Sequence, residues 1–412
     1  MRKRMAMEGR ATTTTTMEGK RCRGIKRGGP VKTKTGTSHR MTNIHQMLKH
    51  TTRLLNTTIT HHTPFSLFPT IRMASTTTLP KTMKTLLQPS RTSYELISTT
   101  APVPTPSHPD DVLVRVAATA PCAGELTWVV AFPASIPQEK QMVPCQDMAG
   151  TVVSAPASSG FVPSDRVYCR IDAQRAGAAR EYALARVSEL AKIPERLGWV
   201  EAAATPLSAL TAWQALFVQG GLDAEGVKGG KENAGKRVLV TGAAGGVGSW
   251  IVQFAKLAGV GGVVAVCSGA GAEAARKLGA DEVVDYTKGT IDEWAEGDRE
   301  KREVDLVVDV VGGKTLAGCW GALKEGGTIV GINTPPDMVK PEGMAKTAGK
   351  SLFFIVEPLG SNLAEIGKLI DAGKVGPTVD SVWEFAEFEQ AFARLDSGHA
   401  KGKIIIKVAD DV

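Results

Sequence analysis

The order of apolar and polar positions changes near the middle of the chain. From about residue 79 to 206 the apolar runs are short, rich in β-branched residues and separated by proline and glycine, as at residues 112–116 (VLVRV). This pattern predicts a compact, mainly β domain. After Pro206, apolar strands alternate with segments in which apolar residues recur at helical spacing. That alternation predicts a doubly wound α/β domain with a parallel sheet.

The second half begins with a continuous apolar run at residues 236–241, the kind of strand that a parallel sheet buries on both faces. A predicted helix follows, with apolar residues at 247, 251, 254, 255 and 258. We then expect strands over residues 263–267, 282–286, 304–311 and 328–332, and helices over 273–278, 291–295, 316–323 and 363–372. The apolar run at 403–408 is one more predicted strand.

A glycine-rich turn joins the first strand of this half to its helix. Ala243, Gly245 and Gly248 form an A-x-G-x-x-G pattern. A small first residue permits a tight turn, the second position lets a pyrophosphate approach the backbone, and the third lets the helix pack closely on the strand. The helix N-terminus offers free N–H groups to the phosphates. We therefore expect dinucleotide binding by the turn, at Ala243, Ala244, Gly245, Gly246, Val247 and Gly248.

The type of coenzyme depends on the end of the next strand. A site for NAD usually has an Asp or Glu there, about 20 residues beyond the glycines. Here the strand ends in Cys267, Ser268 and Gly269, without a carboxylate. A 2′-phosphate would meet no negative charge, and the Ser268 hydroxyl is available as a donor. The sequence therefore favours NADP(H) over NAD(H).

Positive charge is concentrated at the N-terminus. Residues 1–79 hold 15 lysines and arginines against two acids, so the rest of the chain has 34 basic and 40 acidic residues although the net charge is +7. This segment lacks periodicity, and we expect residues 1–79 to form a disordered basic extension. The basic balance is thus no evidence for a nucleic-acid surface on the folded part, and nucleic acid is an unlikely partner.

Three interpretations of the extension remain open. Residues 1–72 resemble a transit peptide in being rich in Arg, Ser and Thr and poor in acids, which would place the protein in mitochondria. Alternatively, translation starts at Met41, Met73 or Met83, and a start at Met73 or Met83 would leave a cytoplasmic enzyme. The third interpretation is a nucleic-acid-binding arm. No apolar run approaches the roughly 20 residues that cross a bilayer, and the six cysteines without a CxxC pair indicate reduced thiols.

Several segments, in the same order, resemble the medium-chain dehydrogenase/reductase superfamily, specifically its zinc-independent quinone oxidoreductase and enoyl reductase branch. They are CQDMAG (145–150), AAATPL (202–207), LTAW (210–213), the glycine-rich turn, LGAD (278–281), GGTIV (326–330) and GKII (402–405). The resemblance implies a GroES-like catalytic domain over residues 80–206, a Rossmann domain inserted over 207–375, and a return to the catalytic domain over 376–412.

The resemblance also implies further coenzyme contacts. These are Thr211, Tyr286, Gly312, Gly313, Asn333, Thr334 and Lys403, with Thr205 near the coenzyme and the substrate. Family members are often dimers, which makes a homodimer the expected assembly besides a small-molecule substrate.

Zinc-dependent members of the superfamily use a Cys and a His-Glu pair as part of a catalytic metal site. Cys122 lies in a segment that resembles their ligand cysteine, but Gln146 and Asp147 stand in place of the His-Glu pair. An amide is a poor substitute for imidazole on zinc. We therefore expect no metal, and we expect Cys122 to be a buried residue or a pocket thiol.

Without a Lewis acid, substrates that accept hydride unaided become favoured: quinones, or alkenes conjugated to a carbonyl. Trp128 and Phe132 are candidates for the substrate pocket, with a core role equally open. None of the four tyrosines lies between Cys122 and Cys145, where some enoyl reductases of the superfamily have their proton donor, so no general acid is assigned. The alternatives are a trans-acting enoyl reductase of fatty-acid or polyketide assembly, and an NADPH-sensing nucleic-acid-binding protein.

Overall fold

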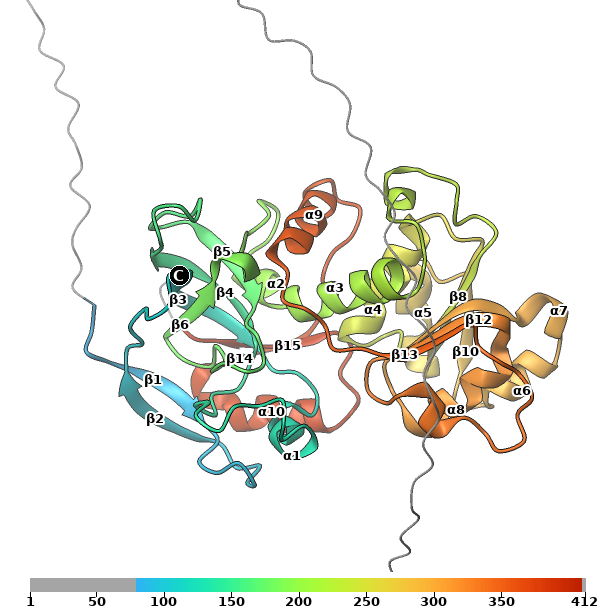
Figure 1. Ribbon diagram of the computed structural model, residues 1–412, viewed down its shortest axis with the longest axis horizontal. Helices are drawn as coiled ribbons and strands as arrows, with labels where there is room; N and C mark the ends of the chain where they lie inside the picture. The colour runs from blue at the N-terminus through green and yellow to red at the C-terminus, as the bar shows by residue number, and fades with distance from the viewer. Residues whose placement is uncertain (1–78, 410–412) are drawn as a thin grey trace, which may run out of the picture. The chain divides into compact units, whose positions relative to one another are not determined.

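A computed structural model describes residues 79–409. Within them, seven strands form the first sheet, in the order β14-β15-β3-β4-β5-β7 with β6 on the other part of β3 (Figure 1). The strands are β3 (Asp111–Ala120), β4 (Asp147–Ser154), β5 (Arg166–Arg170), β6 (Tyr182–Arg186), β7 (Ala191–Lys192), β14 (Val379–Glu384) and β15 (Lys403–Lys407). Because β15 pairs antiparallel with β3, the C-terminal strand returns to the first domain, as predicted.

Two more strands of this half form a hairpin. β1 (Thr82–Leu87) and β2 (Ile97–Pro102) pair antiparallel, and a β-bridge between Thr85 and Arg180, with neighbouring backbone hydrogen bonds, connects them to the rest. The helices here are α1 (Trp128–Ala131), α2 (Trp199–Ala203) and α10 (Phe388–Asp396). The proposed extension falls almost wholly in residues 1–78, which lie outside the described part of the chain.

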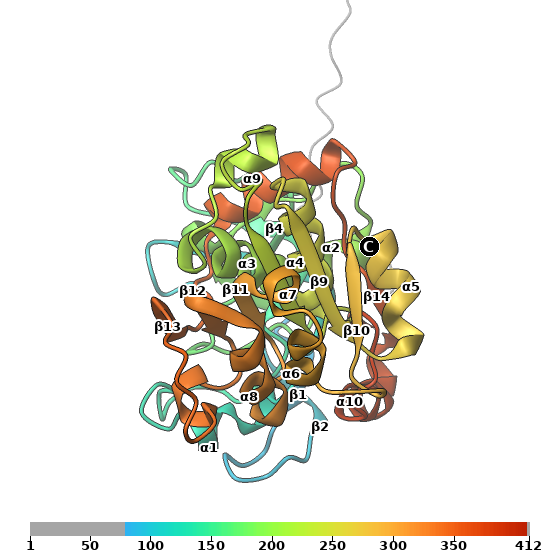
Figure 2. The ribbon, with the colours of Figure 1, turned by 90° about the vertical axis from the view of Figure 1, so that its right-hand side faces the viewer.

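In the described residues, six parallel strands form the second sheet, in the order β10-β9-β8-β11-β12-β13 (Figure 2). This is the 3-2-1-4-5-6 order of a Rossmann fold, whose ligands bind where the strand order reverses, here between β8 and β11. The strands are β8 (Arg237–Thr241), β9 (Gly262–Cys267), β10 (Glu282–Asp285), β11 (Val304–Asp309), β12 (Leu323–Gly331) and β13 (Lys350–Phe353).

Helices cover both faces of this sheet. Alternate residues of β8 lie in different apolar clusters: Val238 packs with Trp250 of α4, and Leu239 packs with Leu316 of α8. The helices are α3 (Pro206–Trp213), α4 (Gly246–Leu257), α5 (Gly269–Lys277), α6 (Ile291–Glu296), α7 (Arg299–Arg302), α8 (Gly313–Ala322) and α9 (Gly360–Asp371). The prediction of a doubly wound α/β sheet inserted in a mainly β domain is therefore confirmed.

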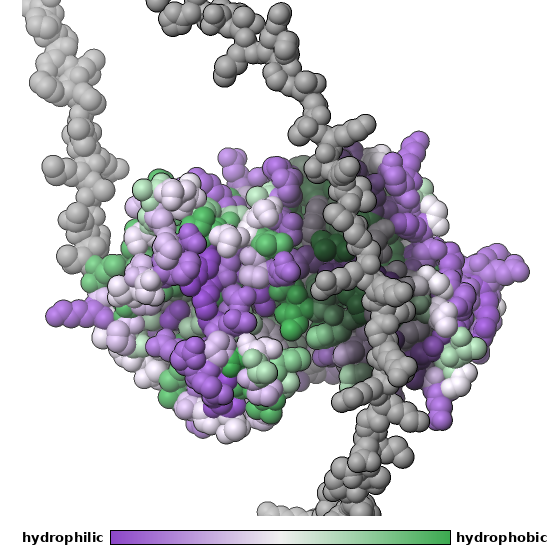
Figure 3. All heavy atoms as spheres, in the orientation of Figure 1, coloured by the Kyte–Doolittle hydropathy of each residue, from purple (hydrophilic) through white to green (hydrophobic). Residues whose placement is uncertain are grey.

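One apolar core continues from the first sheet into the second. Ala118, Ala149 and Tyr168 of the first sheet belong to the same cluster as Val238 and Val240 of the second. The Tyr168 hydroxyl donates to the carbonyl of Leu363 in α9, at 3.0 Å. Figure 3 shows apolar side chains gathered near the middle of one face and hydrophilic ones around them. Among the described residues, no helix combines the length and apolarity that a membrane span requires.

Two of the predicted helices differ from the observed ones at their starts. Helices expected over residues 273–278 and 316–323 begin earlier, at Gly269 and Gly313. Their first turns are rich in glycine and carry no apolar periodicity, so the sequence pattern does not reveal them. The chain from Gln214 to Gln219 forms a π-helical continuation of α3, which periodicity likewise does not show.

Candidate active site

The glycine-rich turn follows β8 with the geometry of a phosphate-binding turn. Gly242 has φ +57, and Gly245 precedes the first residue of α4, Gly246. A Cβ on Gly248 would lie 2.2 Å from the Gly242 carbonyl oxygen, so only glycine permits this contact between helix and turn. A Cβ on Gly245 would meet only that oxygen, at 3.2 Å. The backbone at Gly245 is thus open toward a ligand.

Polar groups from three strand ends meet beside this turn. The buried Asp309 carboxylate, at the end of β11, accepts from the Thr241 hydroxyl at 2.6 Å and from the Gly312 N–H at 2.6 Å. A Cβ on Gly312 would lie 2.5 Å from Thr334 Oγ1, and Asn333 Nδ2 donates to Val311 O at 2.7 Å. Gly312, Asn333 and Thr334, expected as coenzyme contacts, are therefore neighbours at the carboxyl edge of the sheet; Gly313 begins α8 directly after Gly312.

The end of β9 corrects the argument for NADP(H). Ser268, expected as a donor to a 2′-phosphate, is the N-cap residue of α5, but Asp285 of the adjacent strand β10 lies at the same edge. A Cβ on Gly269 would lie 2.7 Å from Asp285 Oδ2. A carboxylate is therefore present near the expected 2′-position, supplied by the neighbouring strand. It accepts from the N–H and hydroxyl of Thr287 at 3.1 and 2.7 Å, and these hydrogen bonds lower its pKa.

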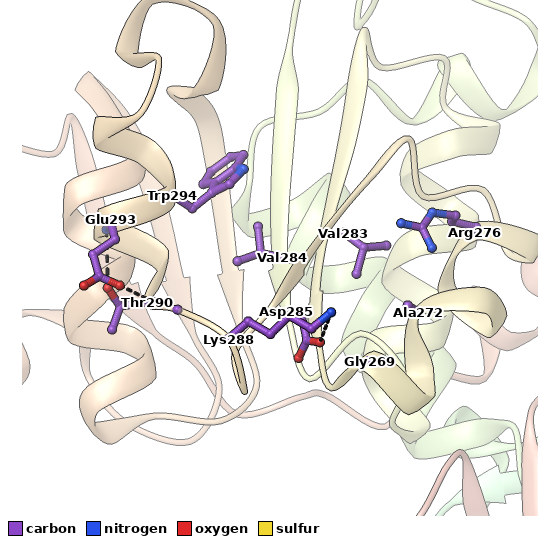
Figure 4. Close-up of a pocket in the computed structure, with 11 residues that line it drawn as sticks. Gly269, Ala272, Arg276, Val283, Val284, Asp285, Lys288, Thr290, Glu293 and Trp294 are labelled. Carbon is purple, nitrogen blue, oxygen red and sulfur yellow. Dashed lines mark hydrogen bonds and ion pairs between the residues drawn. The ribbon is translucent and has the colours of Figure 1, made fainter.

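One lysine lies close to this carboxylate, and an arginine lines the same pocket. Lys288 Nζ lies 3.7 Å from Asp285 Oδ2. Figure 4 shows both residues on an open pocket along β10, with Arg276 on the α5 side and Trp294 on α6. Tyr286, expected near the adenosine phosphate, follows β10 and is 56% exposed, so its ring is accessible. This edge of the sheet therefore carries both signs of charge.

Lys403 connects the first domain to the start of α4. It opens β15 and is buried; its ammonium Nζ lies 2.9 Å from Asp147 Oδ2 and donates to the Pro121 carbonyl at 2.9 Å. Its Cδ lies beside Gly246, where an added Cβ would be 3.0 Å away. Although burial disfavours the charge, the Asp147 carboxylate holds the pKa of Lys403 above its ordinary value. A fixed cation therefore stands beside the phosphate-binding turn.

Asp147 joins three elements. It begins β4, pairs with Lys403 of β15, and accepts from the Leu207 N–H at 2.6 Å through Oδ1. Leu207 lies in the first turn of α3, where the helix dipole favours a negative charge. In the sequence, Asp147 stands out only because it occupies a position of the His-Glu pair of zinc-dependent members. Its pairing with Lys403, which is distant in the sequence, cannot be predicted from a local pattern.

Two expected contacts have their hydroxyls engaged elsewhere. Thr205 is fully buried, and its hydroxyl donates to Glu201 O at 2.7 Å. The Thr211 hydroxyl donates to Leu207 O at the same distance. Each hydrogen bond runs to the preceding helical turn, as is common for threonine in helices. Neither hydroxyl is therefore free to donate to a substrate oxyanion.

The candidate substrate residues lie on the loop after β3. Burial raises the pKa of the Cys122 thiol to about 11, so this thiol is neutral. Trp128 lines a small cavity of about 20 Å³ together with Glu125, Lys140 and Gln146, and Phe132 is 38% exposed at the end of α1. The sequence does not single out Glu125, which stands three positions after Cys122, because its burial is not evident from the local pattern.

The residues near Cys122 do not fit a zinc ion. With its amide nitrogen turned toward two carbonyls, Gln146 donates to Ile171 O at 3.1 Å and to Asp172 O at 3.2 Å. Asp147 is held by Lys403, whose ammonium would repel a divalent cation. Within residues 79–409, no group of three His, Cys, Asp or Glu side chains could hold a metal ion. Catalytic zinc needs three protein ligands.

Two family descriptions match this chain. Residues 108–195 match the alcohol dehydrogenase GroES-like domain, and residues 278–406 match a family described as zinc-binding dehydrogenase. A solved structure of a probable oxidoreductase from Mycobacterium abscessus superposes with a TM-score of 0.65 at 26% identity, covering 80% of this chain and 99% of that one.

Curated relatives match over much of their length. A probable zinc-binding oxidoreductase, mitochondrial, from Arthroderma benhamiae is 43% identical over 82% of this chain and 100% of its own. The mouse NAD(P)H oxidoreductase RTN4IP1, mitochondrial, is 34% identical over 64% of this chain and 69% of its own. The chloroplast envelope quinone oxidoreductase homolog of Arabidopsis thaliana is 33% identical over 74% and 92%. The chain therefore belongs to the medium-chain dehydrogenase/reductase superfamily of oxidoreductases.

Proposed function

We propose that this chain is an NADPH-dependent, zinc-independent reductase that reduces a quinone or an alkene conjugated to a carbonyl. The observation that carries the proposal is the buried Lys403–Asp147 pair beside Gly246. It puts a lysine cation next to the phosphate-binding turn, in the region where zinc-dependent relatives hold their metal. A bound nicotinamide supplies hydride, and the protein aligns the acceptor and excludes water.

The choice of acceptor follows from the groups around Cys122. Oxidation of a plain alcohol needs a group that lowers the hydroxyl pKa, which zinc provides in metal-dependent dehydrogenases. Here Gln146 is bound to carbonyls and Asp147 to lysine, so the site favours acceptors that are already electrophilic. A mouse relative named as an NAD(P)H oxidoreductase and a plant relative named as a quinone oxidoreductase homolog support this class.

NADPH is the proposed coenzyme despite Asp285. That carboxylate already accepts two hydrogen bonds from Thr287 and lies near Lys288, which offsets its charge. Ser268, Arg276 and Lys288 provide donors and positive charge for a 2′-phosphate at the same edge. We expect turnover with NADPH to exceed turnover with NADH, and a strong preference for NADH would refute this part of the proposal.

The mitochondrion is the proposed location, because the fungal and mouse relatives are named as mitochondrial proteins. The basic, acid-poor composition of residues 1–72 is that of a transit peptide. Import of the full chain into isolated mitochondria, with removal of an N-terminal segment, would support this location. A homodimer is the proposed assembly by resemblance to the family.

The test of function uses the purified full chain and NADPH against a panel of quinones and enones. We expect the absorbance of NADPH to fall only when one of these acceptors is present. Simple alcohols with NADP⁺ serve as the contrasting substrates and should give no turnover. Alcohol oxidation that depends on added zinc would contradict the proposal, as would an absence of NADPH oxidation with every acceptor.

A further inference from the structure

Glu125 is a buried carboxyl group with one oxygen unsatisfied. It follows Gly124, begins a short 3₁₀ helix (Glu125–Thr127), and is 8% exposed. Oε2 accepts from the Cys145 N–H at 3.1 Å, whereas Oε1 has no hydrogen-bond partner among the described residues. A buried polar atom without a partner is costly, so such an atom calls for an explanation.

The groups around Glu125 bring its proton equilibrium near neutral pH. Burial raises its pKa to about 7, against the opposing effects of Lys403, the Cys145 N–H, Lys140 and the Cys122 N–H. The Cys122 and Cys145 thiols beside it are neutral, because burial raises their pKa. The charged groups that face this cluster are Lys140, Arg170 and Lys403, with Asp147 and Asp172 opposite them.

Glu125 also lies among residues proposed to form the reaction site: the Lys403 ammonium is close enough to lower the pKa of its carboxyl group, and Trp128, a candidate for the substrate pocket, lines the same cavity. Pro121, four positions before it, accepts from Lys403, and the stem of Lys403 contacts Gly246 at the start of α4. On its other side, Glu125 lines the cavity of about 20 Å³ with Trp128 and Lys140. That volume admits one water molecule. The carboxyl group therefore borders a water-sized opening and lies near the lysine whose stem contacts the coenzyme turn.

Reduction of an enone or quinone needs a proton as well as a hydride. Resting on the proposed function, we propose that the Glu125 carboxyl group is the internal proton donor of this reductase. Hydride forms a new bond to the acceptor, and the displaced electron pair goes to its carbonyl oxygen, giving an enolate or hydroquinone anion. The Glu125 O–H bond then breaks and its proton joins that anion. A proton from bulk solvent, relayed through a water molecule in the cavity, then restores the carboxyl group, so the protein is unchanged, the acceptor is reduced and the coenzyme is oxidised.

A structural role alone is the competing explanation. In it, Glu125 serves only to accept from the N–H of Cys145, whose backbone has the unusual φ of +67. The substitution Glu125→Gln separates the two explanations, because the amide oxygen still accepts from Cys145 but an amide has no acidic proton. Glu189→Gln is the matched control: Glu189 is buried in the same domain, but its carboxylate is fully occupied by Arg175 and the N–H groups of Asp172 and Arg186.

Steady-state kinetics of the full chain with NADPH and its best acceptor provide the first readout. We expect kcat of Glu125→Gln to fall by about 100-fold, within the usual range for loss of a general acid. The binding of NADPH should change by less than about twofold. Wild-type kcat should decline as pH rises through about 7, where the carboxyl group loses its proton; Glu125→Asp should retain this decline, whereas Glu125→Gln should lose it.

The second readout needs neither coenzyme nor substrate. Infrared spectra of the protein at pH 6 should contain a protonated-carboxyl band that Glu125→Gln lacks and Glu189→Gln retains. An active wild type whose Glu125→Gln variant keeps both kcat and its pH dependence would overturn the proton-donor assignment alone. A wild type that oxidises no NADPH, with the infrared band present, would instead overturn the proposed function together with this donor.

Discussion

Replacement of Glu125 by Gln should change how the stability of the protein depends on pH. In the folded chain burial raises the pKa of Glu125 from 4.5 to about 7. Between these values the folded state holds a proton that the unfolded state has released. The contribution of Glu125 to stability is therefore fully present below pH 4.5 and is lost as pH rises through about 7.

The magnitude follows from the displacement of the pKa. At roughly 1.4 kcal/mol per pH unit, raising the pKa from 4.5 to about 7 corresponds to about 3 kcal/mol, most of which disappears between pH 5 and pH 7.5. Glu125 is buried, so solvent screening reduces this figure little. Lys140 does not affect the comparison. Burial lowers its pKa to about 8, so its contribution to stability changes with pH mainly above the range of this assay.

The assay is urea-induced unfolding of wild type, Glu125→Gln and Glu189→Gln at pH 5, 6, 7 and 7.5. We expect the free energy of unfolding of the wild type to fall with pH by about 2 to 3 kcal/mol more than that of Glu125→Gln. Glu189→Gln should follow the slope of the wild type. Parallel pH dependences for wild type and Glu125→Gln would show that the Glu125 carboxyl group is ionised throughout, which would refute the reasoning.

Three further predictions concern the same site. Lys403→Met leaves Asp147 buried without its cation, so we expect urea unfolding to show a free energy of unfolding lower by about 3 to 5 kcal/mol. The double variant that also carries Asp147→Asn should recover part of this loss. A Lys403→Met variant as stable as the wild type would contradict the prediction. Gly248→Ala places a Cβ 2.2 Å from the Gly242 oxygen, so we expect a lower Tm and weaker NADPH binding together, and an unchanged Tm would mean that α4 is not held so closely. Dialysis against EDTA should leave NADPH-dependent reduction intact, and loss of activity restored by zinc would show that a metal is required after all.

The sequence predicted the parts of the fold whose signal is local. Strands buried on both faces give continuous apolar runs, so the parallel strands and the glycine-rich turn were found close to their observed positions. Neither β2 (ISTTAP) nor its partner β1 was predicted. The residues of β2 are mostly exposed and polar, so they form no apolar strand pattern. The edge strand β13 was not predicted either, because four residues are too few for a periodic pattern to be recognised.

The candidate site was predicted less completely, because much of it depends on residues distant in the sequence. Asp285 reaches the end of β9 from the neighbouring strand, so reading only the residues after the glycines gave no carboxylate there. Lys403 and Asp147 meet only because β15 and β4 both lie beside β3. The importance of Glu125 depends on its burial, and nothing in its local sequence indicates that.

The central claim is that a coenzyme diphosphate binds at the N-terminus of α4, against the open backbone of Gly245. Its most direct test is titration of the full-length protein with NADPH for wild type, Gly245→Val and the control Gly235→Val, whose Cβ would have no neighbour within 4 Å. We expect Gly245→Val to raise the Kd for NADPH by more than about tenfold, or about 1.4 kcal/mol, with little change in Tm, and Gly235→Val to bind like the wild type. An unchanged Kd in a folded Gly245→Val variant would contradict the account.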